Sequence, residues 1–252
     1  MENHKIYGLI GFPLTHSFSR QYFNEKFKSE NIDAEYVNFE LPDIGDLMEV
    51  LAENPELAGL NVTIPYKEQV IPYLDEMDDE AEEIGAVNVI KIIRRQSRPD
   101  DFRLKGYNTD VEGFRLSIKP LITPDRHNAL ILGTGGASKA VAQAFRTLGV
   151  DFTFVSRTKR PGVLTYDELT PEIIAGHKVI VNTTPLGMYP HVDECAAIPY
   201  EALTPRHLCY DLLYNPDVTA FMRKAKAHGA EVKNGLEMLL LQAFASWNVW
   251  NS

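Results

Sequence analysis

Cysteine is scarce in this sequence. Its only two examples, Cys195 and Cys209, belong to no CxxC or Cys/His pattern. A disulfide framework and a structural zinc site are therefore both unexpected. Long hydrophobic runs are also missing: no stretch approaches the length of a membrane span, and the N-terminal segment lacks the basic and apolar regions of a signal peptide. We therefore expect a cytoplasmic protein with no metal and no membrane partner.

Positive charge is in the minority, because 25 lysine and arginine residues face 35 aspartate and glutamate residues, which gives a formal net charge of −10. Non-specific binding to nucleic acid or to anionic membranes is therefore disfavoured. Any anionic ligand must be bound by a local cluster of donors. The length of 252 residues and the 44% hydrophobic content fit one large or two medium globular domains.

Apolar strand patterns and amphipathic helix patterns alternate along the chain, which is typical of an α/β fold. A first series ends with a predicted helix over 110–124, which finishes in turn signals. A second series begins near His127. The sequence therefore predicts two α/β domains with their boundary at this helix over 110–124, followed by an apolar helix over 236–250 that can pack on either of them.

The clearest local pattern is a glycine-rich turn between an apolar strand and an amphipathic helix, with the residues Gly133, Thr134, Gly135, Gly136, Ala137 and Ser138. Glycines at such a turn allow close backbone approach, and the helix N-terminus offers free N–H groups to a pyrophosphate. Ser138 departs from the usual Gly or Ala of this fingerprint. The simpler alternative is a plain helix cap, which three glycines in four positions disfavour.

The end of the next predicted strand indicates which dinucleotide binds. NAD enzymes usually place an acidic residue there to accept from the ribose 2′-OH. This chain instead has Ser156, Arg157, Thr158, Lys159 and Arg160. Hydroxyl and cationic groups suit a 2′-phosphate, so the sequence predicts NADP(H) as cofactor. The alternative is a solvated basic loop, which is less favoured in a chain of net charge −10.

Polar residues at predicted turns of the first half are candidates for a substrate site: Ser17, Ser19, Asn61, Thr63, Lys67, Asn88, Asn108, Thr109 and Asp110. Five of them also have a simpler role, as a helix cap for Ser19 and Asp110 and as a turn residue for the three asparagines. Together they suit a small polyhydroxylated acid. A lysine beside an aspartate can move the proton that accompanies hydride transfer to a carbonyl.

A series of motifs, in order along nearly the whole chain, resembles the shikimate dehydrogenase family of NADP-linked enzymes that reduce 3-dehydroshikimate to shikimate. In the first half, Ser17 and Ser19 resemble the family's SxS pair, and “NVTIPYK”, “GAVN” and “YNTD” resemble NVTxPxK, GAVNT and GxNTDxxG. In the second half, the similar segments are “GTGGAS”, “SRT”, “NTTPLGM”, “YDLLYNPDVTAF” and “NGLEMLLLQAFASW”.

The resemblance implies roles for individual residues. Lys67 and Asp110 are expected to form the catalytic pair, with Lys67 exchanging the proton and Asp110 holding the reacting hydroxyl. The residues expected to bind substrate are Ser17, Ser19, Asn61, Thr63, Asn88, Tyr214 and Gln242. Those expected to bind the cofactor are Gly133, Thr134, Gly135, Gly136, Ala137, Ser156, Arg157, Thr158, Lys159, Arg160, Thr183, Met188, Leu212 and Gly235.

The implied fold has residues 1–110 as a substrate-binding and catalytic domain, which helix 236–252 joins, and residues 111–235 as a Rossmann-type NADP domain, with a cleft between them. A small-molecule partner and a monomer or homodimer are expected. The chain departs from the family pattern at Val89, where threonine is usual, and at Ser156, where asparagine is usual. Either Lys159 or Arg160 can meet the 2′-phosphate.

Three other interpretations remain open. A quinate/shikimate dehydrogenase using NAD(P) is the nearest, although the basic run at 157–160 disfavours NAD. A methylenetetrahydrofolate dehydrogenase also joins a lysine-bearing domain to a Rossmann domain, but the paired serines and “YNTD” disfavour it. A non-catalytic NADP sensor is disfavoured because Lys67 and Asp110 are both present.

Overall fold

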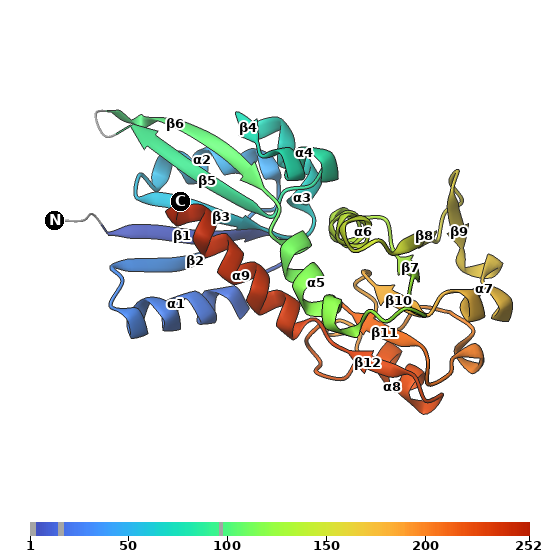
Figure 1. Ribbon diagram of the computed structural model, residues 1–252. Coiled ribbons are helices and arrows are strands. Elements are labelled where there is room, and N and C mark those ends of the chain that lie inside the picture. The colour runs from blue at the N-terminus through green and yellow to red at the C-terminus, as the bar shows by residue number, and fades with distance from the viewer. Residues whose placement is uncertain (1–3, 15–17, 96–97) are drawn as a thin grey trace. The chain divides into compact units, whose positions relative to one another are not determined.

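The computed structural model describes residues 4–14, 18–95 and 98–252. The chain forms two compact units, each with its own six-stranded sheet (Figure 1). Unit 1 comprises Met1–Thr109 with Ala243–Ser252, and unit 2 comprises Asp110–Gln242. The fold is therefore of the mixed α/β class predicted from the alternating patterns.

The sheet of unit 1 has the strand order β2-β1-β3-β5-β6-β4. The first three strands in this order are parallel to one another. Strand β5 runs antiparallel to both β3 and β6, and β5 and β6 form a hairpin. The strands are β1 (Lys5–Gly11), β2 (Ala34–Glu40), β3 (Leu57–Val62), β4 (Glu76–Met77), β5 (Val89–Arg95) and β6 (Arg98–Tyr107). The helices are α1 (Phe18–Glu30), α2 (Leu47–Glu53), α3 (Tyr66–Gln69) and α4 (Asp79–Ile84).

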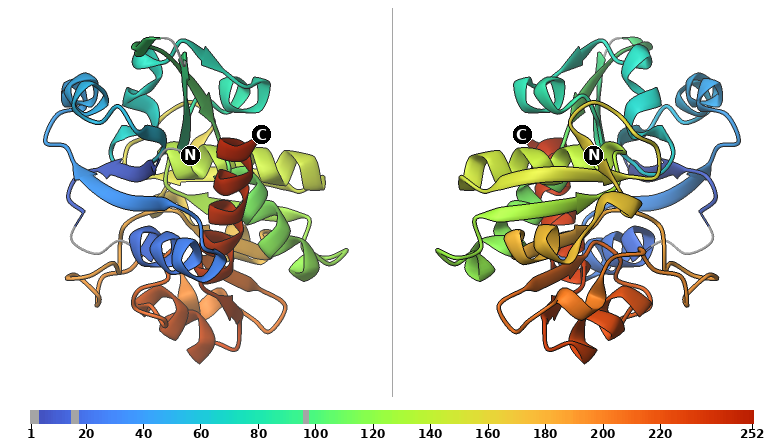
Figure 2. Two further views of the ribbon diagram at one scale, coloured as in Figure 1. Left: turned by 90° about the vertical axis from the view of Figure 1, so that its left-hand side faces the viewer. Right: turned by 90° about the vertical axis from the view of Figure 1, so that its right-hand side faces the viewer.

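Side chains of unit 1 separate into two hydrophobic clusters, because successive strand residues point to opposite faces. Ile10 belongs to the cluster that α2, α3 and α4 cover. Tyr7 belongs to the other, which α1 covers together with the last turns of α9 (Leu236–Asn251). Phe23 and Trp250 are 5.4 Å apart between ring centroids, and their helices lie side by side in Figures 1 and 2.

The sheet of unit 2 is entirely parallel, with the strand order β12-β11-β10-β7-β8-β9. Its strands are β7 (Asn128–Leu132), β8 (Asp151–Ser156), β9 (Val163–Thr165), β10 (Val179–Asn182), β11 (Leu208–Asp211) and β12 (Glu231–Lys233). Its helices are α5 (Asp110–Ile118), α6 (Gly136–Leu148), α7 (Pro171–Gly176), α8 (Ala220–Ala227) and the start of α9. This is a Rossmann-like doubly wound order, which reverses between β7 and β10.

The helix α9 belongs to both units. Its first turns pack on α5 within unit 2, where a Cβ at Gly113 would lie 2.7 Å from the Met238 carbonyl oxygen. From Ala243 onward it contributes to unit 1, where Trp250 donates a hydrogen bond to Ile90 O. The sequence predicted the whole of 236–252 as part of the first domain.

In the described residues, no helix combines the length and apolar character needed to cross a bilayer.

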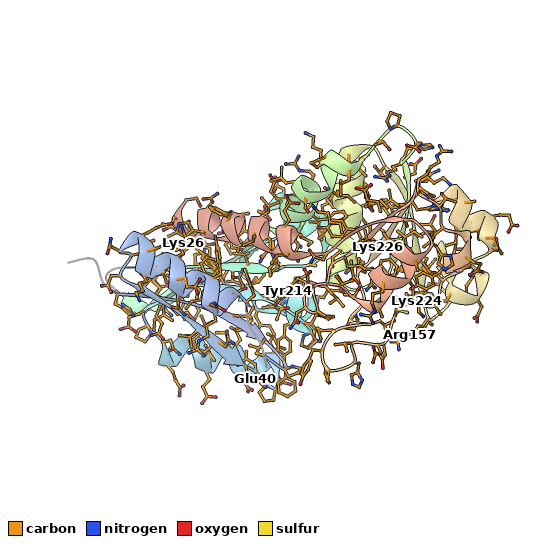
Figure 3. All side chains as sticks on the ribbon, turned by 90° about the horizontal axis from the view of Figure 1, so that it is seen from below. Lys26, Glu40, Arg157, Tyr214, Lys224 and Lys226 are labelled. Atoms are coloured by element: carbon orange, nitrogen blue, oxygen red, sulfur yellow. The ribbon has the colours of Figure 1, made fainter. Side chains whose placement is uncertain are left out.

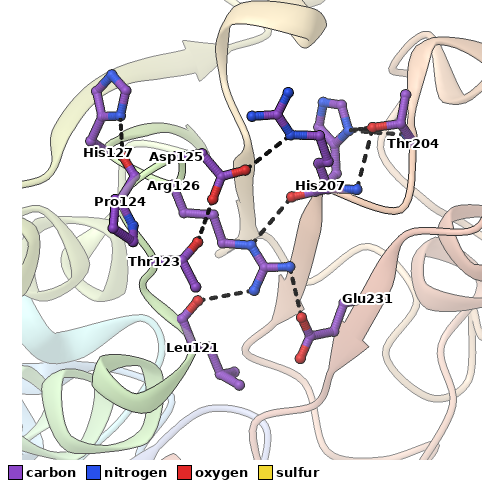
Figure 4. Close-up of polar contacts among 10 residues, drawn as sticks. Leu121, Thr123, Pro124, Asp125, Arg126, His127, Thr204, His207 and Glu231 are labelled. Carbon is purple, nitrogen blue, oxygen red and sulfur yellow. Dashed lines mark hydrogen bonds and ion pairs between the residues drawn. The ribbon is translucent and has the colours of Figure 1, made fainter.

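A buried arginine connects three segments of unit 2 (Figure 4). Arg126, only 8% exposed, donates to the carbonyls of Leu121 and Arg206 and forms a 2.7 Å ion pair with Glu231 on β12. Asp125 pairs with the exposed side chain of Arg206 at 3.0 Å. The link from α5 to β7 is therefore bound to the chain just before β11 and to the first residue of β12.

The predicted helix over 110–124 is too long: α5 ends at Ile118, and a 3-10 turn over Lys119–Leu121 follows. Pro120 explains the early end, because it has no N–H for a helical hydrogen bond. The short strand β9 and the helix α7 were not predicted. Helix α7 has a local signal that could have revealed it, since Thr170 caps it and Pro171 stands at its first position.

Candidate functional site

The glycine turn of unit 2 lies where β7 and β10 end side by side. Gly133 follows β7 with a φ of +116°, a conformation that favours glycine. A Cβ there would lie 2.6 Å from Thr183 Oγ1. Thr183 follows β10 and donates to Leu132 O through its N–H, at 3.0 Å, and through Oγ1, at 2.7 Å. The two predicted cofactor residues Gly133 and Thr183 are therefore in direct contact.

Helix α6 begins directly after this turn. Gly135 precedes it, and a Cβ at Gly135 would meet nothing within 4 Å, so the approach to the helix N-terminus is open. The buried Ser138 donates from Oγ to Gly135 O at 2.6 Å, which accounts for a serine at this position of the fingerprint. Thr134 lies in the turn, and Gly136 and Ala137 are the first two residues of α6. An open helix N-terminus at the reversal of strand order fits a pyrophosphate.

The basic segment follows β8 and lies at the surface. Arg157, Lys159 and Arg160 are all exposed, and Ser156 Oγ accepts from the N–H of Thr158 at 3.2 Å. Lys159 is paired with Glu168 at 2.5 Å, and the lysine lowers the pKa of that carboxyl below its usual value. Lys159 therefore has an anionic partner at the surface.

Further predicted cofactor residues lie on loops of unit 2. Gly235 has no room for a Cβ, because the Leu212 carbonyl would overlap it, and its N–H donates to Leu213 O at 2.9 Å. The structure therefore brings Leu212 and Gly235 together. Met188 is 44% exposed on the loop after β10, and its N–H donates to Pro185 O at 3.1 Å.

A buried carboxylate that the sequence analysis did not single out holds these loops. Asp211, at the end of β11, accepts from Asn182 Nδ2 at 3.0 Å, from Thr219 Oγ1 at 2.6 Å and from the N–H of Leu213 at 3.1 Å. Burial raises the pKa of Asp211 to about 6, against the opposing effect of these hydrogen bonds. An aspartate at the end of an otherwise apolar strand pattern was the signal available in the sequence.

In unit 1, Thr63 and Lys67 follow the end of β3. Thr63 N–H donates to Ile10 O at 2.9 Å, and a Cβ on Gly11 would lie 2.5 Å from Thr63 Cγ2. Gly11 therefore gives Thr63 the room it occupies. Lys67 lies on α3 and is half-buried, and its backbone carbonyl accepts from Val87 N at 2.7 Å.

The structure also places the predicted substrate residues Ser19, Asn61 and Asn88 in unit 1, each at most 9% exposed. Asn61, which the resemblance assigns to substrate binding, has its amide bonded inside the unit: Oδ1 accepts from Tyr36, and Nδ2 donates to Ser246. The buried position of β3 explains this orientation. Ser17 lies outside the described residues.

The remaining predicted residues belong to unit 2. Asp110 is the first residue of α5 and is 5% exposed. Gln242 is 8% exposed, and its Nε2 donates to Leu239 O at 2.9 Å within α9. Tyr214, labelled in Figure 3, is half-buried on the loop after β11. In the part of the chain that the structure describes, no group of three or more His, Cys, Asp or Glu residues could hold a metal ion.

Comparison with known proteins identifies the family. Residues 9–90 match the family model described as the shikimate dehydrogenase substrate binding domain. A curated protein named shikimate dehydrogenase (NADP(+)), from Carboxydothermus hydrogenoformans, is 38% identical over 262 residues, which cover 98% of this chain and 91% of that relative. The chain belongs to the shikimate dehydrogenase family. The resemblance inferred from the motifs is thereby confirmed.

Solved shikimate dehydrogenase structures have the same fold. The crystal structure of the enzyme from Aquifex aeolicus matches with a TM-score of 0.85 and 34% sequence identity, and covers 100% of this chain and 94% of that one. A structure of the Thermus thermophilus enzyme in complex with NADP(H) and shikimate matches with a TM-score of 0.83 and 30% identity, over 98% and 93% of the two chains. The matches therefore extend over both units.

Proposed function

We propose that this member of the shikimate dehydrogenase family reversibly reduces 3-dehydroshikimate to shikimate with NADPH. The observation that carries the proposal is the match along nearly the whole chain to a protein named shikimate dehydrogenase (NADP(+)). The chemistry of both units supports it. Unit 1 supplies hydroxyl, amide and ammonium groups for a polyhydroxylated acid, and unit 2 supplies a glycine turn and a basic segment for NADP(H).

The residues of unit 2 fit NADP(H). Gly133 can adopt its positive φ and approach Thr183, and the space beside Gly135 is open in front of α6. The strand end after β8 carries Arg157 and Arg160 and no carboxylate at positions 156–160, which suits a 2′-phosphate rather than a free 2′-OH. When bound, NADPH supplies the hydride.

Unit 1 supplies the groups that hold the substrate in this proposal. Ser17 and Ser19 bind the carboxylate, and Thr63 and Asn88 hold ring hydroxyls. Gln242 and Tyr214 are proposed to add contacts to the substrate. Such fixed hydrogen bonds orient a rigid ring so that one carbon is presented for reaction.

Lys67 and Asp110 handle the proton. In reduction, the ammonium of Lys67 donates a proton to the oxygen as the carbonyl carbon receives the hydride, and the neutral amine then regains a proton from solvent. In oxidation, the neutral amine accepts the hydroxyl proton. Asp110 accepts a hydrogen bond from the substrate hydroxyl and keeps it oriented. A general acid of this kind contributes about 10²–10⁴-fold to the rate.

The test is the loss of NADPH absorbance with purified protein and 3-dehydroshikimate, with NADH and 3-dehydroquinate in parallel reactions. We expect oxidation of NADPH with 3-dehydroshikimate and much slower reaction in the other combinations. Comparable rates with 3-dehydroquinate or NADH would instead favour a quinate/shikimate dehydrogenase. No reaction of the folded protein in any combination would overturn the proposal.

The role of Lys67 has its own test. Lys67→Ala should lower kcat by about 10²–10⁴-fold and change the KM for NADPH little, because the lost group acts on the reacting oxygen. Lys28→Ala, at an exposed position of α1, is the matched control and should behave as wild type. Full turnover by the Lys67→Ala variant would assign the proton transfer to another group.

A further inference from the structure

Unit 1 contains a line of buried polar side chains that join elements far apart in the sequence. Tyr36 on β2 donates from its hydroxyl to Asn61 Oδ1 at 2.7 Å, and Asn61 Nδ2 donates to Ser246 Oγ on α9 at 3.0 Å. Tyr36 and Ser246 are fully buried, and Asn61 is 5% exposed. Buried polar groups are costly unless they are paired, so each of these bonds constrains both of its partners.

At one end, the line reaches Asn88. Ser246 Oγ lies 3.1 Å from Thr109 Oγ1, and either hydroxyl can be the donor. Thr109 in turn holds Asn88 by two bonds, from its N–H to Asn88 Oδ1 at 2.7 Å and from Asn88 Nδ2 to its Oγ1 at 3.0 Å. These two bonds therefore fix both the rotamer of the Asn88 side chain and the orientation of its amide. Thr109 also immediately precedes Asp110 in the chain.

At the other end, the line reaches Ser19. Burial raises the pKa of Tyr36 well above its ordinary value, and a hydrogen bond with Ser19 acts in the opposite direction. Tyr36 therefore remains neutral, and since its one hydroxyl hydrogen goes to Asn61 Oδ1, Ser19 is the donor in its bond to the Tyr36 oxygen. The Tyr36 ring is held by stacking on Phe23, with centroids 4.8 Å apart and planes 10° from parallel. The bond to Tyr36 therefore positions Ser19 Oγ before the substrate binds, and a bound carboxylate then competes with the Tyr36 oxygen for the single hydroxyl hydrogen.

We infer that Tyr36 and Ser246, connected through Asn61, are positioning residues that fix Ser19 and Asn88 relative to each other. The inference rests on the proposed function, in which Ser19 binds the substrate carboxylate and Asn88 a ring hydroxyl. A rigid ring has a fixed distance between these groups, so both contacts form well only when the protein holds them at the matching distance. A displacement of about 1 Å can cost a hundredfold in rate.

Two substitutions remove one oxygen each and preserve side-chain shape elsewhere: Tyr36→Phe and Ser246→Ala. Each should lower kcat/KM for shikimate by about 10–100-fold and leave the KM for NADP⁺ within about threefold of wild type. The matched control is Tyr7→Phe, at another buried tyrosine of the same aromatic cluster, 1% exposed and outside this line. The control should lose comparable thermal stability and keep its activity.

The double variant tests the connection. If the line acts as a unit, Tyr36→Phe combined with Ser246→Ala should lose little more than the worse single variant, because either change already interrupts the side-chain line between Ser19 and Asn88. The direct bond from Asn61 Nδ2 to the Asn88 carbonyl is long, at 3.4 Å, and does not hold the Asn88 side chain. Shikimate methyl ester adds a second readout. In this substrate a neutral ester replaces the negatively charged carboxylate. Tyr36→Phe should therefore reduce its turnover much less than that of shikimate.

The outcomes separate this inference from the proposed function. Single variants that keep kcat/KM within about threefold of wild type would show that the line serves only stability. Multiplied losses in the double variant would show two independent contributions and overturn the coupling. A wild-type protein that does not turn over shikimate would instead contradict the proposed function, whatever the variants do.

Discussion

Thr219 Oγ1 donates a 2.6 Å hydrogen bond to Asp211 Oδ2. Thr219 Oγ1 also accepts from the N–H of Met222 at the start of α8. One hydroxyl thus caps a helix and binds a buried carboxylate. Asp211 also accepts from Asn182, next to Thr183. The loops that follow β10 and β11 are therefore both hydrogen-bonded to the carboxylate of Asp211.

Asp211 should make stability depend on pH. Burial raises its pKa to about 6 from 3.8, so the folded state binds a proton more tightly than the unfolded state between these values. The contribution to the free energy of unfolding therefore rises as the pH falls through 6, and levels off below 3.8. A shift of roughly two units corresponds to at most about 3 kcal/mol.

Asp211→Asn keeps the shape and removes the ionisation. Urea unfolding of both proteins from pH 7 to pH 4 measures the difference, which should change in favour of wild type as the pH falls. Taking the difference cancels the other acidic groups, which titrate in both proteins. Parallel curves would mean that Asp211 does not titrate in this range.

Gly133→Ala should impair NADP⁺ binding. The new Cβ would combine a φ of +116° with a 2.6 Å approach to Thr183 Oγ1, so the turn in front of α6 must shift. We expect the KM for NADP⁺ to rise about 10–100-fold. Gly176→Ala is the control, because a Cβ there would meet nothing within 4 Å and its φ is not positive. Equal KM values for the two variants would contradict this role of Gly133.

The basic segment should set the preference for NADPH over NADH. Arg157→Ala and Arg160→Ala should each reduce the ratio of kcat/KM values about 10–100-fold, because a charge-assisted bond to the 2′-phosphate is lost. Lys159→Ala should have a smaller effect, since Glu168 already pairs with this lysine. Lys226→Ala, on the exposed side of α8, is the control. A larger effect at Lys159 than at Arg160 would reverse the assignment.

Arg126→Met should destabilise unit 2 by about 2–4 kcal/mol. The change leaves the carbonyls of Leu121 and Arg206 without this donor and removes the ion pair between the buried Arg126 and the exposed Glu231. Arg206→Met is the matched control, because its side chain is 66% exposed and its pair with Asp125 lies at the surface, where solvent screens it and its contribution should be small. Chemical unfolding measures both, and equal losses would contradict the distinction.

Local features could be predicted from the sequence, and contacts between distant segments could not. The turn at Gly133–Ser138 combines strand, glycines and helix in one short stretch, so its placement was readable. Tyr36 and Asn61 are 25 positions apart, and Asn61 and Ser246 are 185 apart. No periodicity within a strand or helix indicates which buried partner it will meet.

The same limit applies to charge. The basic run at 157–160 was visible as a pattern, but the neutralising partner of Lys159 stands nine positions away on a 3-10 turn. The buried state of Asp211 likewise follows from the packing of β11 against its neighbours. The residue types could be predicted, whereas their state of pairing depends on the assembled fold.

The division of α9 between the two units bears on the order in which the protein can fold during synthesis. Unit 2 is continuous in the chain, from Asp110 to Gln242, so all of its residues are made before the last segment of unit 1. Unit 1 receives Ser246 and Trp250 only after that. On the ribosome, unit 1 is therefore the first to begin and the last to be completed. Its aromatic cluster stays uncovered on one side until α9 has been synthesised.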